Sequence, residues 1–225
     1  MTRAVLFDTE TTGLEPHLGH RVIEVAALEL VNDLPTGRHF HALIHPGRDI
    51  PEEATRIHGI SARHLHDKPA FDAVAADLLA FFGIGKLIAH NAQFDFAFLD
   101  AEFSRYGLAR LDQTRMVDTL LLAKTRFPGL PNSLDALCRR FGIDLSARST
   151  HNALLDCKLL AEVYIELTGG RQRGFSLQTE QRMAPVVAYA LTDPRTPRPI
   201  MPTEAELVAH AALIARLPGP LWLDG

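Results

Sequence analysis

One stretch near the N-terminus decides the fold: Arg3-Ala4-Val5-Leu6-Phe7-Asp8-Thr9-Glu10. The run from Arg3 to Phe7 is short and apolar, which is typical of a buried strand, and the acids begin where it ends. Residues i and i+2 of a strand point to the same face, so Asp8 and Glu10 should project together. Open α/β sheets place their sites at such strand ends, and a divalent cation relieves the repulsion between neighbouring carboxylates. The stretch therefore predicts an α/β sheet with a metal site at its edge, although on its own it also fits a solvated strand end.

The following residues alternate between strand-like and helix-like segments. Alternating apolar residues predict strands at 22–31 and 38–45. Residues 32–37 would form the hairpin loop between them, with Asn32-Asp33 as the turn, so these strands should be antiparallel neighbours. Further strands are expected at 86–90 and 116–122, the latter as a strand or a strand-to-helix joint. Apolar residues at helical spacing predict helices at 70–82, 93–106, 133–141 and 152–167.

The amino-acid composition of the chain changes at Gly169-Gly170. Five of the 14 prolines lie between Pro185 and Pro202, and such a stretch forms neither a helix nor a central strand. We therefore expect a domain over 1–168, a flexible linker over 169–202, and a C-terminal helix and tail over 203–225. The tail begins with capping-box spacing at Thr203–Glu206 and contains the single Trp. An apolar helix beyond such a linker favours docking onto a partner over packing back on its own domain.

Composition narrows the class of protein. The chain has 225 residues, of which 47% are hydrophobic and 22% charged. These proportions exclude a fully disordered protein, a collagen-like fibrous protein and a small disulfide-rich protein. Its two cysteines, Cys138 and Cys157, are expected to be buried, reduced thiols of a cytosolic protein. No apolar run is long enough to cross a bilayer, so no membrane contact is expected. The net charge of −4 does not favour a protein that grips nucleic acid unaided; either bound cations offset some acids or a partner supplies the grip.

Two later segments also combine His, Asn and Asp. In His90-Asn91-Ala92-Gln93-Phe94-Asp95 a strand ends, a helix starts and an acid occupies its first turn; taken alone, helix capping explains that acid best. In His151-Asn152-Ala153-Leu154-Leu155-Asp156 the histidine ends a polar loop, and the aspartate lies among residues that face the core. An acid there is costly to bury unless it binds something.

Together the three segments resemble the three motifs of the DEDDh 3′→5′ exonucleases, in the same order and spacing over residues 1–168. The last motif has His where the DEDDy branch has Tyr. The chain also resembles the epsilon-type proofreading exonucleases of bacterial DNA polymerase III. The resemblance lies in the segments Val25–Glu29 and Ile57–Ile60 and in the order of domain, linker and tail. The resemblance implies a ribonuclease H-like α/β fold, a mixed five-stranded sheet flanked by helices, with a C-terminal linker and helix.

The resemblance also implies the chemistry of the site. Two divalent ions, Mg²⁺ or Mn²⁺, would promote hydrolysis to 5′-mononucleotides. Asp8, Glu10 and Asp156 would hold the first ion, Asp8 would also reach the second, and Asp95 would act through metal-bound water. His151 would be the general base, because its ordinary pKa of ~6.5 suits work near neutral pH.

Five further residues are expected to hold the substrate, again by resemblance. The backbone around Thr9 would grip the terminal nucleotide, Leu14 would wedge against the last base, and Phe94 would stack near it. His58 and Asn91 would hydrogen-bond the sugar or phosphate. For Leu14 and Phe94 the alternative is ordinary core packing.

The implied partners are a single-stranded or frayed DNA 3′ end, the alpha subunit of DNA polymerase III through the C-terminal segment, and a sliding clamp through Gln172–Leu177. The expected location is the bacterial cytosol or nucleoid. Two alternatives remain open: a free-standing DEDDh nuclease acting on RNA or short oligonucleotides, which the long tail disfavours, and a binding module that kept the fold without the activity, which the five intact site residues disfavour.

Overall fold

The computed structural model describes residues 2–146, 148, 150–169, 199 and 201–217. By its contacts the chain divides into two compact units, Met1–Ser176 and Leu177–Gly225. The first unit contains a five-stranded sheet and seven of the helices, and the second contains α8 (Glu204–Ile214). Each unit is described by itself.

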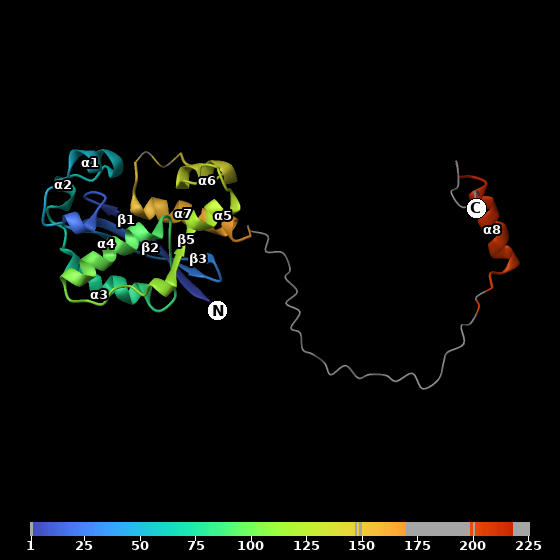
Figure 1. Cartoon of the computed structure of the whole chain (residues 1–225), viewed down its shortest axis with the longest axis horizontal. Coiled ribbons are helices and arrows are strands. Elements are labelled where there is room, and N and C mark those ends of the chain that lie inside the picture. The colour runs from blue at the N-terminus through green and yellow to red at the C-terminus, as the bar shows by residue number, and fades with distance from the viewer. Residues whose placement is uncertain (1, 147, 149, 170–198, 200, 218–225) are drawn as a thin grey trace, which may run out of the picture. The chain divides into compact units, whose positions relative to one another are not determined.

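The sheet is mixed, as expected, and its strands lie in the order β3-β2-β1-β4-β5. Helices lie on either side of it (Figure 1). The central strand β1 pairs with β2 in antiparallel fashion and with β4 in parallel fashion. β3 continues the antiparallel side and β5 the parallel side. The strands are β1 (Arg3–Thr11), β2 (Val22–Val31), β3 (Leu34–Leu43), β4 (Lys86–Ala89) and β5 (Met116–Asp118).

Helices cover both faces of this sheet. Alternate residues of β1 point to opposite faces, so Val5 and Phe7 join one core cluster with α3 and α4, while Ala4 and Leu6 join another with α5, α6 and α7. The helices of the first unit are α1 (Glu52–His58), α2 (Ala62–Leu65), α3 (Phe71–Phe82), α4 (Ala92–Arg105), α5 (Thr119–Arg126), α6 (Leu134–Phe141) and α7 (Ala153–Leu167), with 3-10 turns at Pro16–Leu18 and Gln113–Arg115. The face on which α7 packs is the one toward which Asp8 and Glu10 should point.

The hairpin between β2 and β3 is tighter than expected. Asn32 and Asp33 both adopt positive φ, 51° and 64°, and β3 begins at once with Leu34. Asn and Asp tolerate this left-handed conformation, which gives a two-residue turn that matches the twist of the strands. The turn expected at Asn32-Asp33 is therefore confirmed, whereas the loop expected over 32–37 is wrong, because β3 begins four residues earlier than expected.

The segment 116–122 is a strand-to-helix joint. β5 ends at Asp118, whose carboxylate accepts hydrogen bonds from the backbone N–H groups of Leu120 and Leu121 and so caps α5. Ser133 caps α6 as expected, and Asn152 caps α7. Helices α1 and α2 did not emerge from the sequence, because both are too short to show a helical period.

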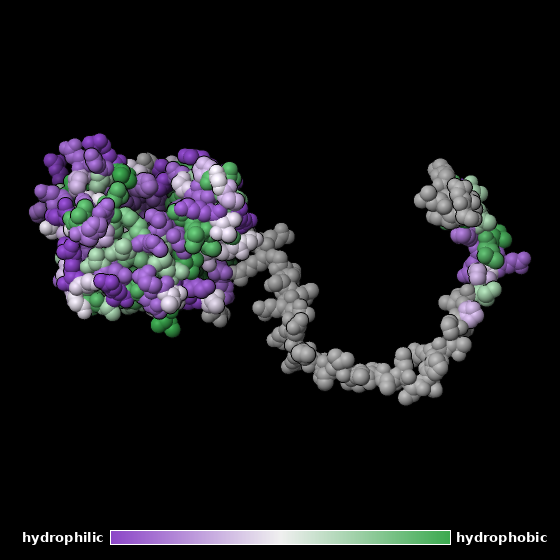
Figure 2. Space-filling model, in the orientation of Figure 1, coloured by the Kyte–Doolittle hydropathy of each residue, from purple (hydrophilic) through white to green (hydrophobic). Residues whose placement is uncertain are grey.

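In the second unit, α8 begins with the expected capping box, in which Thr203 and Glu206 bond each other's backbone N–H groups. Its apolar side chains are exposed, Leu207 and Leu213 at 53% and 56% (Figure 2). The expected clamp-binding peptide Gln172–Leu177, most of the expected linker and Trp222 lie outside the described residues. Among the described helices, none combines the length and apolar character that a bilayer crossing requires.

Candidate active site

The site begins where β1 leaves the core. Asp8 and Glu10 share the alternation of Ala4 and Leu6, so both lie on the α7 face of the sheet. The pairing with β2 shifts register between Glu10 and Thr11, which ends the regular ladder just beyond the second acid. The expectation that the two carboxylates share a face is therefore in accord with the register of the sheet.

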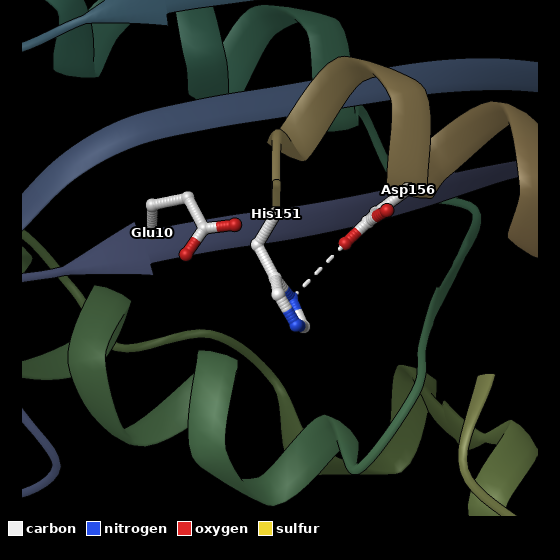
Figure 3. Close-up of side chains that lie close together, drawn as sticks. All are labelled: Glu10, His151 and Asp156. Atoms are coloured by element: carbon white, nitrogen blue, oxygen red, sulfur yellow. Dashed lines mark ion pairs between the residues drawn. The ribbon is translucent and has the colours of Figure 1, made fainter. Parts of the chain in front are cut away.

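Three of the expected residues converge closely. One ligand atom each from Glu10, His151 and Asp156 lie within 4.8 Å of one another. Figure 3 shows the His151 ring between the carboxylates, with Glu10 on β1 and Asp156 on the first turn of α7. His151 Nδ1 lies 3.4 Å from Asp156 Oδ2. Glu10 and Asp156 are buried, whereas His151 stays half-exposed and open to solvent.

Asp95 approaches from the opposite face of the sheet, on the first turn of α4. Its carboxylate accepts hydrogen bonds from the backbone N–H of Thr9, at 3.0 Å, and from the Thr9 hydroxyl, at 2.7 Å. Thr9 lies between Asp8 and Glu10 in β1, so this contact brings the fourth acid to the same strand end. The expected capping role does not account for Asp95, because its oxygen bonds another segment of the chain.

Burial, more than mutual repulsion, raises the pKa values of three of these acids. Burial and then the charge of Asp95 raise the pKa of Asp8 well above its usual value, with Glu10 and Asp156 adding to the effect. Burial raises the pKa of Glu10 to about 8, although His151 opposes it. Burial also raises the pKa of Asp95 to about 7, against the hydrogen bonds from Thr9. Carboxylates that lack enough countercharge take up protons, and a bound cation removes that need.

Asp156 differs because it has a cationic partner. Arg148 Nε and Nη2 donate to its two oxygens at 2.6 Å and 2.8 Å. Burial alone would raise the pKa of Asp156, but the hydrogen bonds from Arg148 and His151 outweigh it, and the pKa is lowered. The contact with Asp156 in turn raises the pKa of His151.

Sequence reasoning missed Arg148. The same guanidinium also bonds Asp135, on the first turn of α6, and its Nη2 lies 3.0 Å from His151 Nδ1. The side chain is only 9% exposed although the residue belongs to a polar loop. No local pattern marks such a residue, because its partners come from α6 and α7 and the path of the loop decides its reach. One hollow, of about 300 Å³, is lined by Asp8, Asp135, Arg148, His151 and Asp156.

A second hollow, of about 460 Å³, contains most of the residues expected to hold substrate. Thr9, Leu14, His58 and Phe94 line it together with Glu10. Leu14 is 76% exposed, so core packing does not explain it. The Phe94 ring packs at a tilt against that of Phe98, with ring centroids 4.8 Å apart, so Phe94 contributes to the core as well as to the hollow.

His58 has an unusual feature in this hollow. Its Nδ1 accepts the backbone N–H of Ile60 at 3.0 Å, which leaves the hydrogen on Nε2. The Nε2 atom is buried and, among the described residues, has no hydrogen-bond partner. A buried donor without an acceptor costs free energy, which suits a residue that donates to a bound ligand.

Asn91 stands apart from the other four. It is exposed, adopts positive φ of 65° at the start of α4, and its backbone N–H donates to Asp118. It lines neither hollow. The structure therefore places Asn91 at the turn that presents Asp95, without bringing it to the residues that line the second hollow.

The donor set suits a hard divalent cation. Four carboxylates on β1, α4 and α7, with one imidazole at the rim, supply the oxygen-rich environment that Mg²⁺ and Mn²⁺ prefer. Burial raises the pKa values of Glu10 and Asp95, and a bound cation would favour their charged forms. A metal bound here would polarise a phosphodiester and help to ionise water.

Comparison with known proteins identifies the family. The model of the exonuclease family matches residues 5–164. The DNA polymerase III subunit epsilon of Rickettsia conorii is 46% identical over 221 residues, covering 96% of each chain, and that of Escherichia coli is 38% identical over 223 residues, covering 94% of this chain and 92% of the other. The chain belongs to the DEDDh exonucleases of the DNA polymerase III epsilon type.

Solved structures agree with the exonuclease fold. Exonuclease X, solved with 5′-overhanging duplex DNA, superposes with a TM-score of 0.59 and 26% identity over 75% of this chain and 91% of the other. The nuclease domain of 3′hExo, a DEDDh member solved with rAMP, superposes with a TM-score of 0.61 at 18% identity, over 76% of this chain and 94% of the other, and so supports the fold alone. The expected ribonuclease H-like exonuclease fold is confirmed.

Proposed function

We propose that this epsilon-type exonuclease proofreads DNA synthesis, removing mismatched nucleotides from the 3′ end as 5′-mononucleotides. The observation that supports the proposal best is the convergence of Glu10, His151 and Asp156 within 4.8 Å, from the end of β1 and the start of α7. Relatives at 38% to 46% identity over nearly the whole chain are named DNA polymerase III subunit epsilon.

The assignment of roles follows from the chemistry of each group. Asp8, Glu10 and Asp156 would hold one divalent ion, and Asp8 would also reach a second. Asp95, whose Oδ1 accepts both hydrogen bonds from Thr9, would act through metal-bound water. Two such ions would stabilise the charge that develops on the attacking and leaving oxygens.

His151 would accept the proton of the attacking water. It is the half-exposed member of the group, and the contact with Asp156 raises its pKa, which strengthens it as a base. An imidazole at the rim can also deliver the proton to bulk solvent.

The second hollow would receive the terminal nucleotide. The exposed Leu14 would lie against the last base, and the unpartnered Nε2–H of His58 would donate to the sugar or phosphate. These contacts do not read a base edge, so preference for mismatches would come from fraying, because an unpaired end costs less to strip from the duplex.

We further propose that residues 1–168 form the exonuclease domain, 169–202 a linker and 203–225 the segment that binds the polymerase alpha subunit, with Gln172–Leu177 as a clamp-binding peptide. The exposed leucines of α8 support docking onto a partner. Association with a replicative polymerase would place the protein in the bacterial cytosol or nucleoid.

The test measures nucleotide release by the full chain, with Mn²⁺ or Mg²⁺, from matched DNA, 3′-mismatched DNA and RNA. We expect mismatched DNA to be the best substrate, and Asp8→Ala or Glu10→Ala to reduce release to background without loss of fold. His151→Ala should reduce the rate about 10²–10⁴-fold, the usual range for a general base. A strong preference for RNA would contradict proofreading and favour a free-standing RNA nuclease.

A further inference from the structure

A buried acid outside the expected set lies beside the site. Glu24 is 1% exposed and lies near the start of β2, between Ile23 and Val25. It lies directly opposite Glu10 across the antiparallel β1–β2 pair, so both carboxylates point to the α7 face. A charged group buried in an apolar strand is costly unless polar partners satisfy it.

Three donors converge on this carboxylate. Glu24 Oε1 lies 2.7 Å from His41 Nε2, on the edge strand β3, and accepts a hydrogen bond from Asn152 Nδ2 at 3.1 Å. Glu24 Oε2 accepts the backbone N–H of Ala153 at 3.2 Å. One side chain of β2 thus holds the first residues of α7, and its charge is favourable at the N-terminus of a helix.

The held residues lie between two site residues. Asn152 caps α7 through its Oδ1, which accepts the N–H of Leu155 at 3.0 Å. The residue before it is His151, and Asp156 follows one turn later. The backbone N–H of His151 is held separately by the carbonyl of Ile57, at 3.1 Å. Glu24 therefore connects the strand beside Glu10 to the segment that presents both other members of the group.

We propose that Glu24 is a positioning residue for hydrolysis: through Asn152 and Ala153 it sets the distance of His151 and Asp156 from Glu10. This inference rests on the proposed function, in which those three residues act on the phosphodiester. Glu24 needs no contact with substrate or metal for this role, because the start of α7 transmits its effect.

The same strand offers a matched control. Glu29 is also buried, at 5% exposure, and also has three hydrogen-bond partners, here the side chains of Arg3, Thr36 and Arg38. These partners lie on β1 and β3, and neither α7 nor any expected site residue is among them. A change at Glu29 therefore disturbs a comparable buried network without reaching the site.

The first experiment compares Glu24→Gln with Glu29→Gln in the full chain. An amide at position 24 turns one acceptor into a donor that faces other donors, so we expect the start of α7 to loosen. For Glu24→Gln, kcat on 3′-mismatched DNA should fall about 10- to 100-fold, as for other residues that orient a metal site. KM should change little, and the Kd for Mn²⁺, measured by calorimetry, should increase. Glu29→Gln should leave kcat and the Mn²⁺ Kd near wild type, even where its melting temperature falls as much.

The second experiment exchanges donor and acceptor. Asn152→Asp alone keeps an oxygen to cap Leu155 but sets a carboxylate against Glu24, so kcat should fall. In the double variant Glu24→Gln, Asn152→Asp, the new amide can donate to the new carboxylate while its oxygen still accepts from Ala153. The partly exposed ring of His41 can change tautomer to accept the second amide hydrogen. We expect the double variant to recover most of the kcat and Mn²⁺ affinity lost in either single variant, a coupling that independent effects do not produce.

The outcomes separate the two proposals. If the wild-type chain releases nucleotides but Glu24→Gln matches Glu29→Gln in kcat, KM and Mn²⁺ affinity, Glu24 is only structural and the inference is overturned. Absence of rescue in a folded double variant also overturns it. If the wild-type chain neither binds Mn²⁺ nor hydrolyses DNA, the proposed function itself fails.

Discussion

The acidic side chains that meet at the end of β1 are buried close together, which is electrostatically unfavourable for their charged forms. Asp8, Glu10 and Asp95 are drawn together by the fold with too little positive charge among them, and burial keeps water from compensating. Asp156 alone has a buried cationic partner, Arg148. The stability of the metal-free protein should therefore depend on pH through Asp8, Glu10 and Asp95. The change in stability on adding metal should depend on Arg148.

The pH dependence has a defined sign. Burial raises the pKa of Glu10 from 4.5 to about 8, so between these values the folded chain binds a proton that the unfolded chain has lost. The contribution of Glu10 to stability is present below pH 4.5 and is lost as the pH rises through about 8. We expect Glu10→Gln to stabilise the chelator-treated protein more at pH 9 than at pH 5.5, measured by urea unfolding. An equal effect at both pH values would contradict the raised pKa.

Arg148 should act as a resident counterion. Arg148→Ala leaves Asp156 buried without its guanidinium, and breaking a buried pair of this kind costs about 3–5 kcal/mol. In chelator the melting temperature should fall, and the rise on adding Mn²⁺ should exceed that of the wild type, because the ion then supplies missing charge. Arg139→Ala is the control, since Arg139 is 71% exposed and lies 3.8 Å from Asp135. Equal Mn²⁺ shifts in all three proteins would show that Arg148 does not serve this role.

At the scale of elements, the parallel pair β1–β4 decides how α4 reaches the site, because α4 starts just after β4 ends. Gly85 precedes β4, and a Cβ there would lie 2.3 Å from the backbone oxygen of Arg3. Backbone cannot yield as a flexible side chain can, so this close approach requires glycine.

Gly85→Ala should therefore destabilise the fold by about 1–3 kcal/mol, the usual cost of overpacking. Urea unfolding of the full chain measures the loss. The neighbouring Ile84→Ala is the control: Ile84 is 98% exposed, so its truncation should stay within about 0.5 kcal/mol of wild type. Equal stability of Gly85→Ala and wild type would mean that the strand pair tolerates a wider separation.

At the scale of the whole molecule, the two compact units differ in how many of their apolar side chains are buried. The first has an apolar cluster on each face of its sheet and a smaller third one around Ile23, Ile60 and Leu65, whereas α8 of the second has no buried residue among those described. An 11-residue helix with exposed leucines is marginal in water by itself. The first unit should therefore fold alone, and the second should gain stability from a partner.

A chain that ends at residue 176, the limit of the first unit, should keep its melting temperature and its release of nucleotides from single-stranded DNA. It should lose co-purification with the polymerase alpha subunit, which the full chain retains. The end of α7 is closed by Arg126, which bonds the carbonyls of Glu166 and Leu167, so the cut removes no contact described within the domain. Retained association of the shortened chain would contradict docking through the tail.

Local chemistry was readable from the chain alone. The apolar run before Asp8, the cap at Ser133 and the capping box at Thr203 depend on neighbours in sequence, so strands, helix starts and the acids at their ends could be predicted. Together with the resemblance of the three motifs, this was enough for the fold and the family. The hairpin at Asn32-Asp33 was misjudged only in length, because several turn types fit those residues.

Tertiary structure alone decided which side chains meet. Arg148 reaches the site and Glu24 lies beside it because a loop and a neighbouring strand pass within hydrogen-bond reach of α7, whereas Asn91 lines neither hollow. A buried acid within β2 was a signal that a partner must exist, but its identity lay 128 residues away in the chain. Sequence pattern reports the conformation of a segment, whereas contacts between distant segments depend on the path of the chain that joins them.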